Sequence, residues 1–105
     1  MKTIKVTYTV KQAFAQKNQE NVRAFIKDLE KINHPAIRYI AYLGEDGKTF
    51  THIASYESDE GQKVLFGLES FRSFQQQRDD SGLEVAPRIE TIETVAASYN
   101  QFQEV

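Results

Sequence analysis

The period of the apolar residues changes along the chain, and this change constrains the fold more than any other feature. Apolar and polar residues alternate strictly over residues 3–10, which is typical of a half-buried strand. From about Asn18 the apolar residues recur every three or four positions, which indicates a helix with one buried face. Asn33 tolerates a left-handed backbone conformation, and Pro35 cannot continue a helix, so the helix is predicted to end there.

A β-hairpin is predicted next. Residues 37–43 and 49–56 are rich in β-branched and aromatic residues, and the segment 44–48 between them contains the pair Asp46-Gly47. An Asp-Gly pair between two such runs is a strong turn signal.

A second helix and a last strand complete the pattern. Ser58 is the expected N-cap of a helix whose apolar stripe extends to Phe74, with a break or bend expected at Gly67 and Ser70. Residues 79–82 have the composition of a loop, and Arg88 to Ser98 are expected to form a long strand. No element is assigned to residues 99–105.

The order β-α-β-β-α-β predicts an α+β domain with the ferredoxin-like fold. In this topology the first and third strands lie in the centre of one antiparallel sheet, and both helices cover the same face. With 105 residues and no internal repeat or linker, the chain is expected to form a single domain over residues 1–105.

Side-chain alternation also predicts which face of the sheet the helices cover. The more apolar set is expected under the helices: Ile4, Val6, Tyr8, Val10, Ile37, Tyr39, Ala41, Leu43, Phe50, His52, Ala54 and Tyr56. The other face combines polar and apolar residues: Thr7, Thr9, Arg38, Ile40, Tyr42, Thr51, Ile53 and Ser55. A patch that contains Ile40, Tyr42 and Ile53 is typical of an interface, so a homodimer that stacks sheet against sheet is predicted.

Composition excludes several classes of protein. The chain has no Cys and a net charge of −2, so thiolate metal sites and disulfides are excluded and a basic nucleic-acid-binding surface is not expected. No apolar run approaches 18 residues, so no membrane segment is expected. The first residues lack the apolar core of a signal peptide, and a cytoplasmic protein is the expectation.

Two segments of the sequence resemble a known family. Residues 46–57 (DGKTFTHIASYE) and 68–75 (LESFRSFQ), together with the order of elements, are similar to the antibiotic biosynthesis monooxygenase-like group of dimeric α/β-barrel proteins. The resemblance covers roughly residues 3–98. It implies a homodimer whose two sheets form a shared barrel, with a pocket between sheet and helices in each subunit. The group contains cofactor-free oxygenases of polycyclic aromatics, haem-degrading enzymes and members without an assigned activity.

His52 is the most informative single residue. Its expected neighbours are aromatic side chains from the strands and the second helix: Tyr8, Tyr39, Tyr56, Phe71 and Phe74. An imidazole among phenols could exchange a proton with an acidic aromatic substrate, and the tyrosines and phenylalanines would then line its binding site. The alternative is a core histidine whose polar atoms are satisfied by a tyrosine hydroxyl or a backbone carbonyl.

Other chemistries find little support in the sequence. His34 and His52 are the only histidines and do not have metal-ligand spacing, so neither a metal site nor a cofactor is expected. Haem-degrading relatives depend on a pocket Trp and a His of the second helix, and this chain has no Trp and no His in residues 59–78. RNA recognition is also disfavoured, because Thr49 stands where the RNA-recognition motif needs Gly, and Phe50 and Tyr56 are assigned to the covered face.

Two functions remain open at this level. The first is a cofactor-independent monooxygenase that acts on an aromatic or quinol-like small molecule near His52. The second is a non-enzymatic dimeric domain that binds a ligand or a partner on the same scaffold. The two differ in whether the space between sheet and helices is open or filled. The inward-facing Phe25, Phe50, Phe71 and Phe74 favour a filled core.

Overall fold

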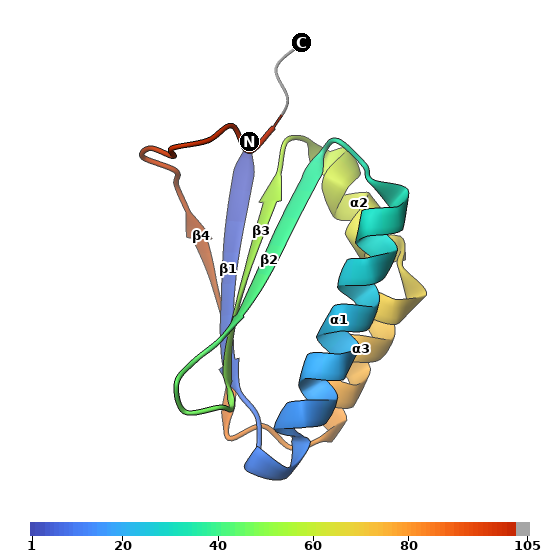
Figure 1. Ribbon diagram of the computed structural model, residues 1–105, viewed down its shortest axis with the longest axis vertical. Coiled ribbons are helices and arrows are strands. Elements are labelled where there is room, and N and C mark those ends of the chain that lie inside the picture. Colours follow the sequence, from blue (N-terminus) through green and yellow to red (C-terminus); the bar gives the residue numbers. More distant parts are fainter. Residues whose placement is uncertain (103–105) are drawn as a thin grey trace.

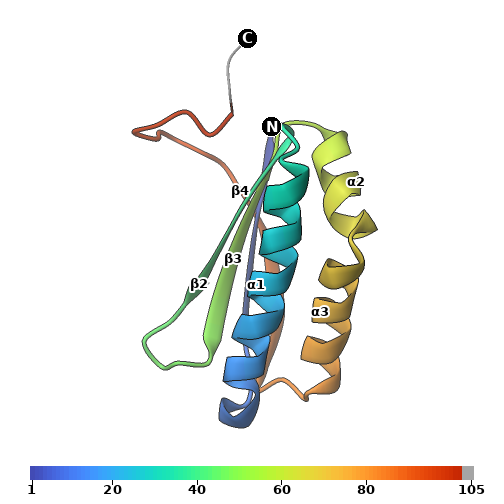
Figure 2. The same cartoon turned by 45° about the vertical axis from the view of Figure 1, so that its right-hand side comes forward.

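The computed structural model describes residues 1–102, which form one sheet and a layer of helices (Figure 1). The elements in chain order are β1 (Lys2–Thr9), the 3₁₀ turn η1 (Gln12–Phe14), α1 (Ala15–Ile32), β2 (Ile37–Leu43), β3 (Thr49–Tyr56), α2 (Asp59–Gly67), α3 (Glu69–Asp80) and β4 (Val85–Ile92). The four strands have the order β2-β3-β1-β4, and all neighbours are antiparallel. All three helices lie on one side of the sheet (Figure 2). The predicted α+β ferredoxin-like topology, with the first and third strands in the centre, is confirmed.

The first helix begins earlier than its apolar period indicates. α1 starts at Ala15, directly after η1, whereas the sequence pattern placed the start near Asn18. Its end is as predicted, since Asn33 has the left-handed conformation with φ 48° and its backbone N–H donates to the Leu29 carbonyl. The buried stripe of α1 contains Val22 and Phe25, and it presses these side chains onto the sheet.

The hairpin turn between β2 and β3 is held by the residues that predicted it. Gly47 has φ +75°, which an L side chain rarely adopts. The Asp46 carboxylate accepts hydrogen bonds from the backbone N–H groups of Lys48 and Thr49 at 2.9 and 2.8 Å. The Thr49 hydroxyl also donates to this carboxylate, and this bond, together with the two backbone bonds, holds the pKa of Asp46 below its usual value.

The expected break in the second helix lies at Leu68, directly after Gly67. Leu68 has an extended backbone (φ −76°, ψ 125°) that ends α2 and begins α3. Ser70 lies inside α3 and its hydroxyl donates to Asp28 of α1 at 2.6 Å, so this serine joins two helices and does not bend one. Ser58 is the N-cap of α2, as predicted, but its side chain makes no capping hydrogen bond.

The last strand is shorter than predicted and is displaced towards the N-terminus. β4 covers Val85–Ile92, whereas Arg88 to Ser98 was the expected range. Pro87 lies inside the strand, because β4 pairs only with β1 and an edge strand tolerates a residue without an N–H donor. The β1–β4 register shifts between Thr7 and Thr9, close to this proline.

The predicted covered face is largely correct, with one exception at the end of β2. Tyr8, Phe50 and His52 are buried beneath the helices, but Leu43 is exposed, because it lies next to the hairpin turn. All members of the covered set other than Leu43 are buried or pack against the core cluster.

The face without helices is partly covered by the chain itself. Ser55 and Thr9 were expected on an open surface, but both are buried. Ser55 accepts a hydrogen bond from Gln101 at 3.5 Å, and Arg38 lies over the ring of Phe102. The segment 99–102 therefore crosses one end of this face; residues 103–105, for which no element was assigned, lie outside the described residues.

None of the helices in residues 1–102 is long and apolar enough to span a membrane.

Candidate functional site

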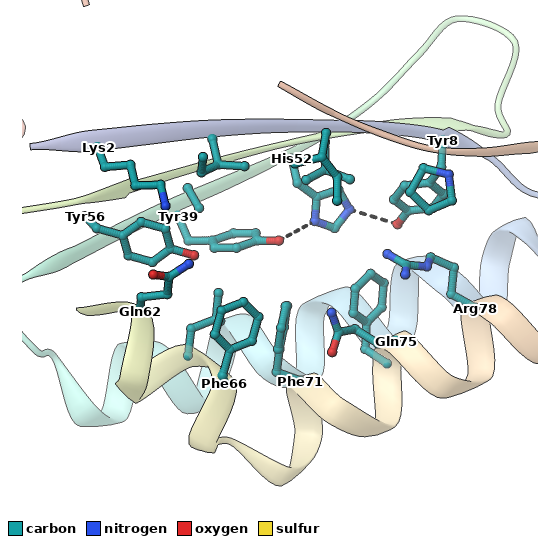
Figure 3. Close-up of a pocket in the computed structure, with 17 residues that line it drawn as sticks. Lys2, Tyr8, Tyr39, His52, Tyr56, Gln62, Phe66, Phe71, Gln75 and Arg78 are labelled. Carbon is teal, nitrogen blue, oxygen red and sulfur yellow. Dashed lines mark hydrogen bonds between the residues drawn. The ribbon is translucent and has the colours of Figure 1, made fainter. Parts of the chain in front are cut away.

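A cavity of about 310 Å³ lies between the sheet and the helices α2 and α3 (Figure 3). Its floor includes Ile4 and Val6 of β1 and Ile89 of β4, and its roof includes Leu65 and Phe66 of α2. This volume is in the range that small-molecule sites occupy. The expectation that phenylalanine side chains fill the space is therefore wrong.

The phenylalanines divide between filling and lining. Phe25 of α1 lies at the centre of the aromatic core, with its ring centroid 5.0–5.1 Å from those of Tyr39, Phe71 and Phe74. Phe50 stacks on Tyr8 at 5.5 Å. Phe71 and Phe74 pack against Phe25, and they also line the cavity. The number of inward-facing aromatic residues in the sequence does not show which of them fill the core and which line the cavity.

All six candidate site residues lie along this one cavity. Tyr8 comes from β1, Tyr39 from β2, His52 and Tyr56 from β3, and Phe71 and Phe74 from α3. Figure 3 shows Tyr39, His52 and Tyr8 in a row along the sheet side, with Phe71 opposite them. Strand alternation accounts for this convergence, because every second residue of the three adjacent strands points to the helices.

His52 bridges two tyrosine hydroxyl groups. Its Nε2 lies 2.8 Å from the Tyr8 hydroxyl, and its Nδ1 lies 2.6 Å from the Tyr39 hydroxyl. The Tyr8 hydroxyl is also bonded to Asn18 Nδ2 at 2.8 Å. The imidazole is thus satisfied by tyrosine hydroxyls, as the core-histidine interpretation predicted, and it also borders a cavity, as the binding-site interpretation requires.

Asn18 determines the direction of this hydrogen-bond chain. Its Nδ2 donates to the Tyr8 oxygen, so the one hydroxyl hydrogen of Tyr8 is available to His52 Nε2. A neutral imidazole that accepts at Nε2 carries its hydrogen on Nδ1 and donates it to Tyr39. The hydroxyl hydrogen of Tyr39 is then left for an acceptor in the cavity. Asn18 Oδ1 is buried and has no hydrogen-bond partner within residues 1–102.

Burial determines the protonation states of this chain. Desolvation, with a smaller effect from the charge of Arg78, lowers the pKa of His52 from 6.5 to about 3. Desolvation also raises the pKa of Tyr8 and Tyr39 well above 10, and it raises the pKa of Tyr56 to about 12. At neutral pH the imidazole and the three phenols are uncharged, so they act as hydrogen-bonding groups.

The sequence analysis missed the polar residues at the two ends of the cavity. Arg78 and Gln75 of α3 lie at the end near Tyr8, and Lys2 and Gln62 lie at the end near Tyr56 (Figure 3). A signal for Arg78 exists, because it continues the inward stripe of α3 at a spacing of four after Phe74.

Asn18 was also missed as a member of the site. It lies four positions before Val22 on the buried stripe of α1, and this spacing is the signal that could have found it. Within residues 1–102, no group of three His, Asp or Glu side chains is arranged to hold a metal ion.

Fold and cavity together define a small ferredoxin-like domain with a ligand-sized space between its sheet and its helices. No family model matches the sequence, and no curated protein matches it either. Solved structures do match. A protein from Nitrosomonas europaea described as a candidate antibiotic biosynthesis monooxygenase is 13% identical with a TM-score of 0.76, and the match covers 91% of this chain and 100% of that one.

Two further structures give the same result. A candidate antibiotic biosynthesis monooxygenase from Caulobacter crescentus is 18% identical with a TM-score of 0.74, and 90% of each chain is covered. A protein from Pseudomonas aeruginosa is also 18% identical, with a TM-score of 0.71 and coverage of 90% of this chain and 94% of that chain. At these identities the comparisons confirm the predicted resemblance in the fold.

Proposed function

We propose that this protein is a cofactor-independent monooxygenase that binds an electron-rich aromatic or quinol-like molecule in the cavity beside His52. The observation that carries the proposal is the open, aromatic-lined cavity in which a chain of hydroxyl and imidazole groups ends at Tyr39. Structures described as antibiotic biosynthesis monooxygenases share its fold, which supports the same class of chemistry.

The proposed reaction applies to a phenol that carries a hydrogen on the ring carbon opposite its hydroxyl, and it converts this phenol and one O₂ into a quinone and one water. The ring carbon opposite the hydroxyl gains one oxygen atom of O₂. The second oxygen atom leaves as water with the hydrogen of that carbon and the hydrogen of the hydroxyl. Electron-rich phenols suit this reaction, since their ionised forms give electrons to O₂ directly, and the aromatic walls would hold a flat ring between sheet and helices.

In this proposal Tyr8, Tyr39, Tyr56, Phe71 and Phe74 form the substrate-binding walls, and His52 is the polar centre. With a pKa of about 3, the imidazole does not retain a substrate proton at neutral pH. Its role is to orient the Tyr39 hydroxyl, which donates a hydrogen bond to the substrate oxygen. The substrate proton would leave to solvent.

The test measures oxygen uptake and melting temperature with a panel of quinols and polycyclic phenols. We expect uptake above that of heat-denatured protein, and a raised Tm for compounds that bind. His52→Gln should reduce both responses, whereas His34→Gln, which changes the other histidine outside this cavity, should leave both unchanged. Binding without oxygen uptake would instead support a non-enzymatic ligand-binding domain.

We also propose that the protein is a homodimer formed through the sheet face without helices. On this face Ile40 and Tyr42 of β2 are exposed. In the β2–β3 register they lie opposite Ile53 and Thr51 of β3, at the end of the face that the segment 99–102 leaves uncovered. A two-fold interface pairs one patch with its own copy, and the exposed apolar side chains at this place support such an interface.

Light scattering at micromolar concentration tests the dimer. We expect twice the mass of one chain for the native protein and a single-chain mass for Ile53→Glu, because two like charges would face each other in the interface. Arg23→Glu introduces the same side chain on the exposed surface of α1 and should remain dimeric. A single-chain mass for the native protein would contradict the proposal.

A further inference from the structure

Among residues 1–102, the side chains that line the cavity include a cation at each end and no carboxylate. Lys2 lies next to Tyr56 and Gln62 at one end, and Arg78 lies below Tyr8 at the other (Figure 3). Between these ends the lining is mostly aliphatic and aromatic, and its polar groups are the uncharged imidazole of His52 and the tyrosine hydroxyls bonded to it. A ligand that matches this distribution has a flat apolar body with a polar group at each end.

Arg78 is held inside the site by packing. Its side chain is only 11% exposed, and its guanidinium carbon lies 5.2 Å from the ring centroid of Tyr8 and 5.4 Å from that of Phe74. Its Nε pairs with Asp79, a largely exposed carboxylate, at 3.0 Å. In the part of the chain that the structure describes, the two terminal amino groups of the guanidinium make no hydrogen bond to protein.

A guanidinium in this setting favours an anion. Its planar, paired N–H donors fit two oxygens of a carboxylate or a single phenolate oxygen, and charge-assisted hydrogen bonds are stronger away from water. A neutral ligand would leave part of this donor capacity unused, and a cationic ligand would meet like charge at both ends of the cavity.

We infer that the cavity binds an aromatic anion, with its ionised oxygen on Arg78 and a second polar group at the Lys2 end. The inference rests on the proposed function only in taking this cavity as the binding site. It adds the substrate class, since a phenol or quinol bound beside two cations would be held in its ionised form. That form is the one that reacts with O₂, so His52 need not take up a proton.

Three probes with the same naphthalene body test this inference by calorimetric titration at pH 7.5. They are 6-hydroxy-2-naphthoate, its neutral isostere 6-hydroxy-2-naphthamide, and the cation 2-naphthylmethylammonium. We expect the carboxylate to bind at least about tenfold more tightly than the amide, as befits one charge-assisted hydrogen-bonded pair, and the cation to bind most weakly.

Two matched variants locate the charge preference. Arg78→Gln should bind the carboxylate and the amide with similar affinity, while its affinity for the amide stays close to that of the native protein. Arg88→Gln removes an equal charge from a β4 side chain that is 77% exposed and pairs with Glu90, and it should keep the full preference. Arg78→Lys retains the charge without the paired N–H donors of the guanidinium, so an intermediate preference for the carboxylate is expected. This variant replaces Arg78→Gln in the test if Arg78→Gln does not fold.

Several outcomes would overturn the inference: equal binding of carboxylate and amide by the native protein, equal effects of Arg78→Gln and Arg88→Gln, or no binding of any probe. Oxygen uptake is measured separately and tests the proposed function. An anion preference without oxygen uptake supports the inference and contradicts the monooxygenase. Oxygen uptake with neutral substrates, together with no charge preference, does the reverse.

Discussion

The helix-covered face of the sheet has two unlike halves. Beneath α1 the strands β2 and β3 are closely packed, with Phe25 fully buried and Ile37 only 6% exposed. Beneath α2 and α3 the sheet borders the cavity with side chains from all four strands, and Ile89 of β4 is 70% exposed. The same apolar alternation therefore produces a filled core on one side and a binding space on the other.

The helices explain this difference. α1 is continuous and lays one apolar stripe along the sheet, whereas the second helical segment is interrupted at Leu68. α3 is bonded to α1 through Ser70–Asp28 at 2.6 Å and Asn21–Gln77 at 3.1 Å. Because α1 holds α3 in place, α3 does not need to collapse onto β1 and β4, and the space beneath it stays open.

The largest expected effect is in the filled half. Phe25→Ala removes a fully buried ring that contacts Tyr39, His52, Phe71 and Phe74, and it should lower the free energy of unfolding by about 3–5 kcal/mol. Urea denaturation measures this value. A loss below about 1 kcal/mol would show that the two halves do not differ as described.

The matched substitution in the open half is Phe66→Ala. Phe66 also lines a space between sheet and helices, but its side chain is 46% exposed. We expect a loss of about 1–1.5 kcal/mol in the same urea experiment, because only about half of the apolar surface of this residue leaves water on folding. An effect as large as that of Phe25→Ala would mean that the cavity wall contributes as much to the free energy of unfolding as the filled half does.

At the boundary of the two halves, His52 makes stability depend on pH. Its pKa is about 3 in the folded protein and 6.5 when unfolded, so the unfolded chain binds the proton first as the pH falls. The stability that the neutral imidazole contributes to the folded state is complete above pH 6.5 and is lost progressively towards pH 3. Between pH 7 and pH 5 the loss should be about 2 kcal/mol.

The His52→Gln variant isolates this effect from other titrations. The pH dependence of its unfolding free energy should be flatter than that of the native protein by the same amount, as measured by urea denaturation at each pH. His34→Gln removes the other histidine, and comparing its pH profile with that of His52→Gln separates the two residues. If His52→Gln has the native pH profile, the imidazole is not desolvated in the folded state.

The position of α2 depends on a glycine that the sequence analysis did not single out. A Cβ at Gly61 would overlap the carbonyl group of Ala36, so Gly61→Ala should displace the helix and destabilise the protein by about 1–3 kcal/mol. Gly67→Ala at the other end of α2 meets open space and should be close to neutral. Thermal unfolding of both variants compares the two, and equal effects would contradict this view of how α2 is held.

The smallest effect is expected in the tautomer of His52. Nitrogen-15 NMR of histidine-labelled protein should show His52 protonated on Nδ1 and not on Nε2, because Asn18 makes Tyr8 a donor. Asn18→Leu removes that donor and should shift the tautomer balance towards Nε2. His34 gives an internal reference in the same spectrum, and an Nε2–H tautomer in the native protein would reverse the assigned direction.

Local pattern sufficed for the elements and their order. Alternation in β1, the stripe of α1 and the Asp46-Gly47 turn each reflect a backbone preference that acts within a few residues, and the structure confirms all three. Strand ends were less predictable. β4 stops at Ile92 because its pairing with β1 ends there. The residues of β4 alone do not specify where this pairing ends.

Only part of the candidate site could be predicted from local sequence pattern in the same way. The sequence by itself determined which side chains face the helices, so Tyr8, Tyr39, His52 and Tyr56 could be assigned to one side by alternation. Only the tertiary structure decided that the space beside them is open, that His52 joins two tyrosines with Asn18 behind them, and that Arg78 reaches in from α3. Alternation is a property of one strand, whereas a cavity depends on how far a helix stands from the sheet, and contacts between distant residues set that separation.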